Sequence, residues 1–458
     1  MKLFQLLTAL LVTLGAISHA APKPNIVFFL IDDLGYADCG FNGGKDIKTP
    51  NIDQLAKGGA ILESHYVQPV CSPTRAALMT GRYATHTGVY TIVRPGAKWG
   101  LPLAERTLAN ALKDVGYETA ITGKWHLGEF DPAYVPTARG FDHQYGHYFG
   151  ALDYFTHIRD GSHDWYRDGK ELKEEGYATE LIAREACRLI AEKKENPLFL
   201  YVPFNGVHSP LQAPDSYLAP YANLTGKRKT MAGMLAAVDA AIGQIVAALE
   251  KAGLRENTLI AFSADNGGPT QFSNDNGPLR AGKGTIYEGG VRAAAFANWP
   301  GQIPAGVTIK EPMHIVDWYP TLVKLAGGSL EQKLPLDGRD VWPMLTKSAK
   351  SPHDAILLVQ SPERAAVRVG DWKLMMNASE DAGDSVPEGQ AKAKGRKDAG
   401  GNALYNLAGD IGEKTDLAAK EPERVAAMRA KLQELLKNAA PEGQLAAGGD
   451  APPKRKKK

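Results

Sequence analysis

The sequence predicts an α/β protein with a large mixed, mostly parallel sheet that is sandwiched by helices, and a smaller C-terminal unit. Three observations support this fold class. Buried strand patterns alternate with amphipathic helix patterns over residues 25–264. Each of these strands ends in a polar or glycine-rich tip, which is typical of ligand-binding parallel sheets. After residue 350 the pattern changes to short, closely spaced strands and one helix, which predicts an antiparallel sheet.

The elements of the larger unit, residues 22–350, follow one another in a regular order. The apolar run 25–31 predicts a strand buried on both faces, and Thr49–Gly58 has a cap, a proline and a terminal glycine in helical order. We expect further helices at 103–115, 180–194 and 230–252, and further strands at 117–122, 197–203 and 259–263. Helices that separate successive strands predict parallel pairing.

The C-terminal unit is expected over residues 351–440. Short strands are predicted at 355–359, 365–369, 372–376 and near 404–407, and a helix at 422–438. Residues 379–402 are rich in small and charged residues and predict a loose surface loop. Residues 441–458 end in five basic residues and predict a disordered basic tail.

The N-terminus and the composition predict an exported protein. Residues 1–20 have the features of a signal peptide: an early lysine, an apolar run and the small-residue cleavage site Ser18-His19-Ala20. No later apolar run is long enough to span a bilayer, so we expect no stable membrane insertion. The net charge of +2 gives no reason to expect a nucleic-acid partner. With three cysteines in the chain, Cys39 and Cys187 could pair or remain free thiols.

A cysteine lies just before the helix expected over residues 73–80. Ser72 is expected to be the N-cap, Pro73 the first helical residue and Gly81 the end. Cys71 would then lie where free N–H groups and the helix dipole favour an anion, and Arg75 would point back toward it. Taken alone, the pattern is equally compatible with a helix start beside a buried cysteine.

Acidic and amide side chains follow two of the predicted strands. Asp32 and Asp33 follow the first strand, and Asp265 and Asn266 follow the strand at 259–263. Ligands collect at the carboxyl ends of parallel strands, so the four side chains should meet. All-oxygen ligation suits Ca²⁺ or Mg²⁺ and disfavours zinc. Either pair alone is more often a polar turn.

Cationic and imidazole side chains complete the candidate site. Lys124 and Lys283 stand in glycine-bounded stretches, and with Arg75 they could bind an oxyanion. His126 and His208 could move protons near neutral pH. Outside such contexts these residues would be surface lysines and structural histidines.

These motifs together resemble the type I sulfatase family of the alkaline phosphatase superfamily. Cys71-Ser72-Pro73-Thr74-Arg75 is similar to the family signature. Further matching stretches are Gly123–Gly128, Arg139–Asp142, Asp153–His157, Val207–Gln212 and Arg280–Arg292. The resemblance runs from about Pro24 to Leu417, and within the family it points to the arylsulfatase B, or N-acetylgalactosamine 4-sulfatase, type.

The resemblance implies an alkaline phosphatase-like fold and a modified nucleophile. Cys71 would be oxidised to formylglycine by a formylglycine-generating or maturase enzyme. One Ca²⁺ would be held by the modified Cys71 together with Asp32, Asp33, Asp265 and Asn266.

The reaction that the resemblance implies has two steps. A hydroxyl of the aldehyde hydrate at Cys71 attacks sulfur, and His208, assisted by Lys283, protonates the leaving alcohol. His126 then takes the proton of the second hydroxyl, and sulfate leaves. The expected substrate is a sulfated carbohydrate.

Two other functions are compatible with parts of this pattern. The first is a phosphonate monoester or phosphodiester hydrolase of the same superfamily, since phosphate and sulfate are nearly isosteric. The second is a catalytically inactive protein that binds sulfated glycans. Such a protein would be expected to have lost at least one site residue, and none of the six is lost: Cys71, Arg75, Lys124, His126, His208 and Lys283.

Residues 134–166 are unusually aromatic and are expected to form a wall of the sugar site. Within this segment Asp153, His157 and Trp165 are predicted to contact the substrate. Phe141 and Phe149 are predicted to pack into the core instead.

Overall fold

The computed structural model describes residues 23–192, 195–380, 401–437 and 439–441. The signal-peptide prediction, the basic tail and most of the expected loop at 379–402 lie outside these residues. The larger unit contains a ten-stranded sheet in the order β13-β2-β12-β11-β1-β10-β4-β5-β8-β9. Its parallel centre consists of β1 (Asn25–Ile31), β4 (Glu118–Lys124), β5 (His143–His147), β10 (Leu198–Phe204) and β11 (Thr258–Ala264).

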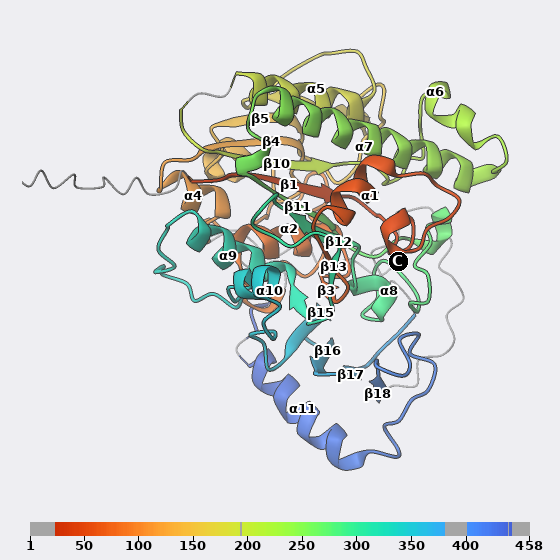
Figure 1. Ribbon diagram of the computed structural model, residues 1–458. Coiled ribbons are helices and arrows are strands. Elements are labelled where there is room, and N and C mark those ends of the chain that lie inside the picture. Colours follow the sequence, from red (N-terminus) through yellow and green to blue (C-terminus); the bar gives the residue numbers. More distant parts are fainter. Residues whose placement is uncertain (1–22, 193–194, 381–400, 438, 442–458) are drawn as a thin grey trace, which may run out of the picture.

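The centre of the sheet is buried on both faces, as the apolar strand patterns predict. Every residue of β1, β10 and β11 is buried. In Figure 1, α1 (Pro50–Lys57), α5 (Ala178–Ala191) and α7 (Gly226–Lys251) lie on one side of the sheet. On the other side lie α2 (Cys71–Thr80), α4 (Leu108–Lys113) and α9 (Trp318–Leu325).

Shorter elements extend the sheet and connect its layers. The outer strands are β2 (Ala60–Leu62), β8 (Tyr166–Arg167), β9 (Lys170–Glu171), β12 (Ala295–Asn298) and β13 (Val307–Ile309), of which β9 and β13 form the two edges. Two small ladders join β3 (His65–Tyr66) to β14 (Met313–His314) and β6 (Ile158–Arg159) to β7 (Ser162–His163). The short helices are α3 (Ala84–Thr87), α6 (Asp215–Leu218), α8 (Glu288–Val291) and α10 (Trp342–Lys347). The antiparallel pairing of β12 makes the sheet mixed.

The C-terminal unit is a four-stranded antiparallel sheet with one long helix, at the lower end of Figure 1. Its strands are β15 (Ile356–Ser361), β16 (Arg364–Val369), β17 (Trp372–Met376) and β18 (Asn402–Asn406). Helix α11 (Pro422–Leu436) packs on β16 and β17. A second apolar cluster joins Tyr66, Ile286 and Val291 of the larger unit to side chains of this sheet, so the two units share a core.

Several predicted boundaries differ from the structure, including those of α4 and β4. The helix expected from residue 103 begins at Leu108, because Thr107 and Asn110 form a capping box at that point. The strand expected to end at residue 122 continues to Lys124, so this lysine belongs to β4 and its register is set by the sheet.

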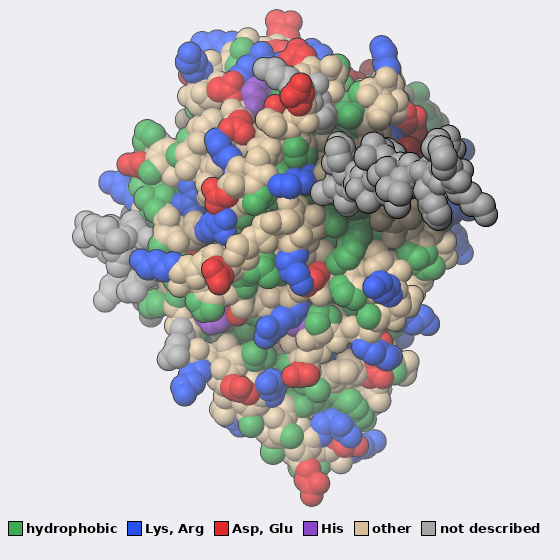
Figure 2. Space-filling view, turned by 60° about the vertical axis from the view of Figure 1, so that its left-hand side comes forward, with side chains coloured by type: hydrophobic (Ala, Val, Ile, Leu, Met, Phe, Trp, Pro, Cys, Tyr) green, Lys and Arg blue, Asp and Glu red, His purple; other side chains and the backbone are tan. Residues whose placement is uncertain are grey.

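One described helix, α7, is long and apolar enough to cross a membrane by length and composition alone. Most of its apolar window, 61%, is buried inside the protein, where α7 contacts α1 and α5. That burial is typical of a core helix. On the face drawn in Figure 2, acidic and basic side chains of the described residues are interspersed, without a continuous field of one sign.

Candidate active site

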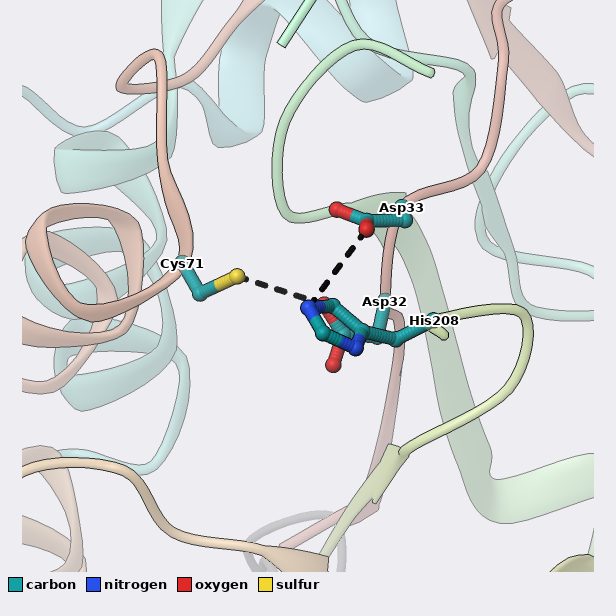
Figure 3. Close-up of side chains that lie close together, drawn as sticks. All are labelled: Asp32, Asp33, Cys71 and His208. Atoms are coloured by element: carbon teal, nitrogen blue, oxygen red, sulfur yellow. Dashed lines mark hydrogen bonds and ion pairs between the residues drawn. The ribbon is translucent and has the colours of Figure 1, made fainter. Parts of the chain in front are cut away.

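The ends of three parallel strands bring the predicted site residues together. Asp32 and Asp33 follow β1, Asp265 and Asn266 follow β11, and Lys124 ends β4. The backbone N–H of Asp33 donates to Oδ1 of Asp265 at 3.2 Å, which ties the two strand ends directly. Figure 3 shows Asp32 and Asp33 facing Cys71 and His208 across this edge.

Cys71 is the first residue of α2, and its thiol points into the carboxylate cluster. Its Sγ donates to Oδ1 of Asp32 at 3.3 Å. The prediction that Ser72 caps this helix is wrong. The N-cap is Val70, and the Ser72 hydroxyl donates to the carbonyl oxygen of His126 at 2.9 Å and accepts from the N–H of Val93 at 3.0 Å. The serine therefore anchors the loop that carries His126.

The unmodified Cys71 side chain is a neutral thiol. Burial and the carboxylates of Asp265 and Asp32 raise its pKa well above the ordinary range, and Lys124 and Lys283 offset only part of that effect. A thiolate would have to form beside two carboxylates at a buried position. A thiolate nucleophile at neutral pH is therefore disfavoured.

Three cations pair with the three carboxylates of the site. Nζ of Lys124 lies 2.5 Å from Oδ2 of Asp32, and Nζ of Lys283 lies 2.6 Å from Oδ1 of Asp33. Nη2 of Arg75 lies 2.7 Å from Oδ2 of Asp265. The Nζ of Lys283 also lies 3.4 Å from the Sγ of Cys71.

These ion pairs shift the pKa values of the carboxyl groups, and the paired side chains differ in their exposure to solvent. Burial raises the pKa of both Asp33 and Asp265. Lys283 and His208 nevertheless bring that of Asp33 below its ordinary value, whereas the charge of Asp32 keeps that of Asp265 above it. The side chains of Arg75, Lys124 and Asp265 have no exposure, whereas Lys283 is 10% exposed.

His208 is partly exposed and His126 is enclosed. His208 is 14% exposed, and its Nε2 lies 3.6 Å from Oδ2 of Asp33 (Figure 3). Its Nδ1 lies 2.5 Å from the carbonyl oxygen of Ser209, so Nδ1 carries the proton and Nε2 faces the site. Burial and the charge of Lys283 lower the pKa of His208 to about 3. Nε2 of His126 lies 2.9 Å from the carbonyl oxygen of Val93, and burial with Lys124 lowers its pKa well below the ordinary value.

The oxygen donors of the site fit a hard divalent cation. Ligand atoms of Asp32, Asp33, Cys71 and His208 all lie within 4.8 Å of one another. Within the described part of the chain, Oδ1 of Asn266 is buried without a hydrogen-bond partner, although its Nδ2 donates to Oδ1 of Asp33 at 2.8 Å. A buried carbonyl oxygen without a donor is costly unless a cation or water satisfies it. The donor set therefore fits Ca²⁺ or Mg²⁺.

The structure argues against two of the three predicted sugar contacts. His157 and Trp165 are both fully buried, and their rings stack with centroids 4.4 Å apart. They are core residues in this fold, because the aromatic side chains of the segment pack on one another. The carboxylate of Asp153 accepts from Nε2 of Gln212 at 2.6 Å, which holds the loop at His208. Phe141 packs in the core as predicted.

A cavity of about 550 Å³ lies beside His208, and its lining includes Asp153, the third predicted sugar contact. It is lined by the loop that follows β5, by residues 209–211 and by two side chains from other elements, Lys227 and Phe272. Phe272 follows the Asp265-Asn266 motif closely, so the sequence could have placed it near the site. Lys227 lies at the start of α7, where no sequence motif marks it as a site residue.

One further histidine and two cysteines lie outside this cluster. His86 is a structural residue, with its Nδ1 2.7 Å from Oδ2 of Asp337. Cys39 and Cys187 are free thiols, Cys39 buried and Cys187 half-buried.

Comparisons with known proteins agree with this geometry. A sequence model of the Sulfatase family matches residues 24–329. Arylsulfatase J of Mus musculus is 36% identical over 461 residues, covering 92% of this chain and 77% of that protein. A crystal structure of Ps i-CgsB in complex with k-i-k-neocarrahexaose has a TM-score of 0.83 at 35% identity, covering 92% of this chain and 94% of that one.

A likeness to a phosphonate monoester hydrolase bears on the fold alone. That enzyme, from Agrobacterium radiobacter, has a TM-score of 0.62 at 21% identity, covering 92% of this chain and 97% of that one. The match of the family model over most of the chain and the identity to a named arylsulfatase are more specific. The chain therefore belongs to the Sulfatase family, within the type I sulfatases of the alkaline phosphatase superfamily, and is a sulfate ester hydrolase.

Proposed function

We propose that this sulfatase removes sulfate from a sulfated carbohydrate, with Cys71 converted to formylglycine and one bound Ca²⁺. The observation that carries the proposal is the convergence of Arg75, Lys124 and Lys283 on the carboxylates around Cys71. Such a cluster can neutralise a sulfate group and the negative charge that develops as its ester bond breaks.

The proposed reaction needs two groups at this site: formylglycine at residue 71 and a bound Ca²⁺. When formed, formylglycine at position 71 would provide a hydrated aldehyde, which carries a hydroxyl nucleophile and a second hydroxyl that the neutral thiol lacks. When bound to Asp32, Asp33, Asp265 and Asn266, Ca²⁺ would provide Lewis acidity toward sulfate oxygens. The unpaired Oδ1 of Asn266 supports this donor set.

The cations are suited to holding the sulfate in one orientation. Arg75 is fixed, because Nη2 pairs with Asp265 and Nη1 donates to the carbonyl oxygen of Lys124 at 3.1 Å. Lys283 is the most exposed of the three cations, so the sulfate group would enter from its side. We infer that Arg75 and Lys124 form the floor of the sulfate site and Lys283 its rim.

The two histidines are suited to opposite proton transfers. His208 presents Nε2 at the solvent-accessible side, where the leaving alcohol would be. The incoming sulfate would favour its protonated form, so that it can protonate that alcohol. His126 lies deeper, and its Nδ1 is buried without a hydrogen-bond partner within the described ranges. It is suited to receive a proton from a group on Cys71 as sulfate is released.

The cavity beside His208 is the surface that we propose for the sugar, and five of its lining residues belong to the predicted wall: Leu152, Asp153, Ile158, Arg159 and Asp160. Its apolar lining includes Ile158, which is 44% exposed, and Phe272, and its polar lining includes Arg159 and Lys227. Sugar rings stack on apolar faces and bond polar side chains through their hydroxyls. Ps i-CgsB, the similar solved structure, is described in complex with an oligosaccharide.

The test is a panel of sulfated mono- and oligosaccharides, together with a small aryl sulfate, in which released sulfate is measured. We expect Phe272→Ala to raise KM for a sulfated oligosaccharide and to leave turnover of the aryl sulfate unchanged. Leu103→Ala is the control, since Leu103 is exposed and does not line this cavity. Equal loss on both substrates, or no loss on either, would place the sugar site elsewhere.

The same panel tests the other functions. A phosphonate monoester or phosphate diester turned over faster than every sulfate ester would favour the hydrolase alternative. Binding of sulfated glycans without any release of sulfate would favour an inactive binding protein. We also propose export to the periplasm or the medium, and maturation by a formylglycine-generating enzyme, on the strength of residues 1–20 and of Cys71.

A further inference from the structure

The loop that carries Lys283 is held at both ends by the C-terminal unit. At the start of the loop, Nη1 of Arg280 donates to the carbonyl oxygen of Glu413 at 2.7 Å. At its end, the backbone N–H of Glu288 donates to Oε2 of Glu413 at 2.7 Å. Glu413 of the C-terminal unit therefore accepts one hydrogen bond from the Arg280 side chain, before Lys283, and one from the Glu288 backbone, after it.

A buried ion cluster fixes the same contact. Nζ of Lys373, on β17, lies 2.8 Å from Oε1 of Glu288 and 2.9 Å from Oε1 of Glu413, and all three side chains have no exposure. Oε2 of Glu288 accepts from the hydroxyl of Tyr66 at 2.8 Å. Buried charges are tolerated only where their partners are held in good geometry, so this cluster has little freedom to rearrange.

The loop between these two contacts is short and internally bonded. The backbone N–H of Gly289 donates to the carbonyl oxygen of Arg280 at 2.9 Å, which closes the loop on itself. The N–H of Gly284 donates to the carbonyl oxygen of Pro69, two residues before Cys71, at 2.8 Å. A shift of either end would therefore move Lys283 relative to Cys71.

We propose that Glu413 and Lys373 are positioning residues, which hold Lys283 at its observed place against Asp33 and Cys71. The inference rests on the proposed function, in which Lys283 binds the sulfate group. It gives the C-terminal unit a role in catalysis, although none of this unit's described residues contributes a side chain to the sulfate site.

The experiment compares Glu413→Ala with the conservative Glu413→Gln. The alanine removes one of the two carboxylate partners of Lys373 and the acceptor for the Glu288 N–H, whereas glutamine keeps an acceptor oxygen. Glu105 provides a matched control, because it is also buried and pairs with Arg82 at 3.1 Å elsewhere in the larger unit. Each variant is assayed for kcat, KM, thermal midpoint and the Ki of inorganic sulfate as a competitive inhibitor.

We expect Glu413→Ala to lower kcat by about tenfold or more and to raise the Ki of sulfate about fivefold, with most of both values restored in Glu413→Gln. Glu105→Ala should lower the thermal midpoint but leave kcat and the Ki of sulfate at their wild-type values. Wild-type kcat and sulfate Ki in Glu413→Ala would overturn the proposal.

A second variant covers the case in which Glu413→Ala does not fold. Arg280→Met removes the partly exposed end of the contact, since its side chain is 29% exposed, and it should weaken sulfate binding in the same way. Unchanged sulfate binding in Arg280→Met would overturn the proposal. Wild-type enzyme that releases sulfate from no ester would instead refute the proposed function.

Discussion

Gly150 lies against the imidazole of His126, and adding one methyl group there tests how closely the position of that ring controls turnover. A Cβ on residue 150 would lie 2.5 Å from both Cε1 and Nε2 of His126. Carbon atoms in contact stay about 3.5–4.0 Å apart, so the ring would have to move by about 1 Å. Gly150 does not have a positive φ, so the backbone itself tolerates alanine.

The expected magnitude follows from the contacts of that ring. Overpacking of a buried site costs about 1–3 kcal/mol, and losing the bond from Nε2 to Val93 costs about 1 kcal/mol more. A well-placed proton-transfer group contributes about 10²- to 10⁴-fold to rate, so a displaced ring should lower kcat at least about tenfold. Because His126 is proposed to act during sulfate release, Gly150→Ala should release alcohol in a rapid burst that is followed by slow sulfate release.

The assay is rapid-quench kinetics on a chromogenic aryl sulfate, with alcohol and sulfate measured separately. Gly409→Ala is the control, since a Cβ at this exposed glycine would meet nothing within 4 Å. If Gly150→Ala shows the same burst, kcat and thermal midpoint as Gly409→Ala, His126 is not a proton-transfer group whose position controls turnover.

Three further predictions follow from the contacts of the site and of the sheet. Removing Ca²⁺ with a chelator should abolish sulfate release without changing the far-UV circular dichroism spectrum, and added Ca²⁺ should restore activity. Full activity in the presence of chelator would show that the four oxygen donors form a polar turn and hold no metal. Asp265→Ala should also destabilise the fold, by about 3–5 kcal/mol in chemical denaturation, because it leaves the buried Arg75 without its 2.7 Å partner. Burial raises the pKa of Glu185, but hydrogen bonds from His143 and Arg188 bring it from 4.5 to about 2. Its stabilisation is therefore complete above about pH 4.5 and is lost as the pH falls toward 2. The difference in thermal midpoint between wild type and Glu185→Gln should thus be constant from pH 7 to 5 and shrink below 4.5, and a constant difference down to pH 3 would contradict this.

The strand ends and the residues that follow them were predictable because their signals are local. A buried apolar run predicts β1, the carboxyl ends of parallel strands meet at one edge, and Asp32 and Asp265 therefore come together. The helix end at Gly81 was predictable for the same reason, since its φ of 67° suits glycine.

The features that sequence reasoning missed depend on tertiary partners. Ser72 has the composition of a cap, but the carbonyl of His126 and the N–H of Val93 engage its hydroxyl. Trp165 belongs to an aromatic-rich segment, and whether such rings face solvent or one another is decided by packing. Glu413 is far from Lys283 along the chain and has no motif around it, so its contact with the Lys283 loop is visible only in the fold.

The central claim is that sulfate esters are cleaved at Cys71, and sulfate release by wild type and by Cys71→Ala tests it most directly. Both proteins would be produced with a formylglycine-generating enzyme and incubated with a sulfated oligosaccharide, and free sulfate would be measured by ion chromatography. Wild type should release sulfate and carry an aldehyde at residue 71 by peptide mass, whereas Cys71→Ala should release none above background. Equal sulfate release by the two proteins would contradict the account.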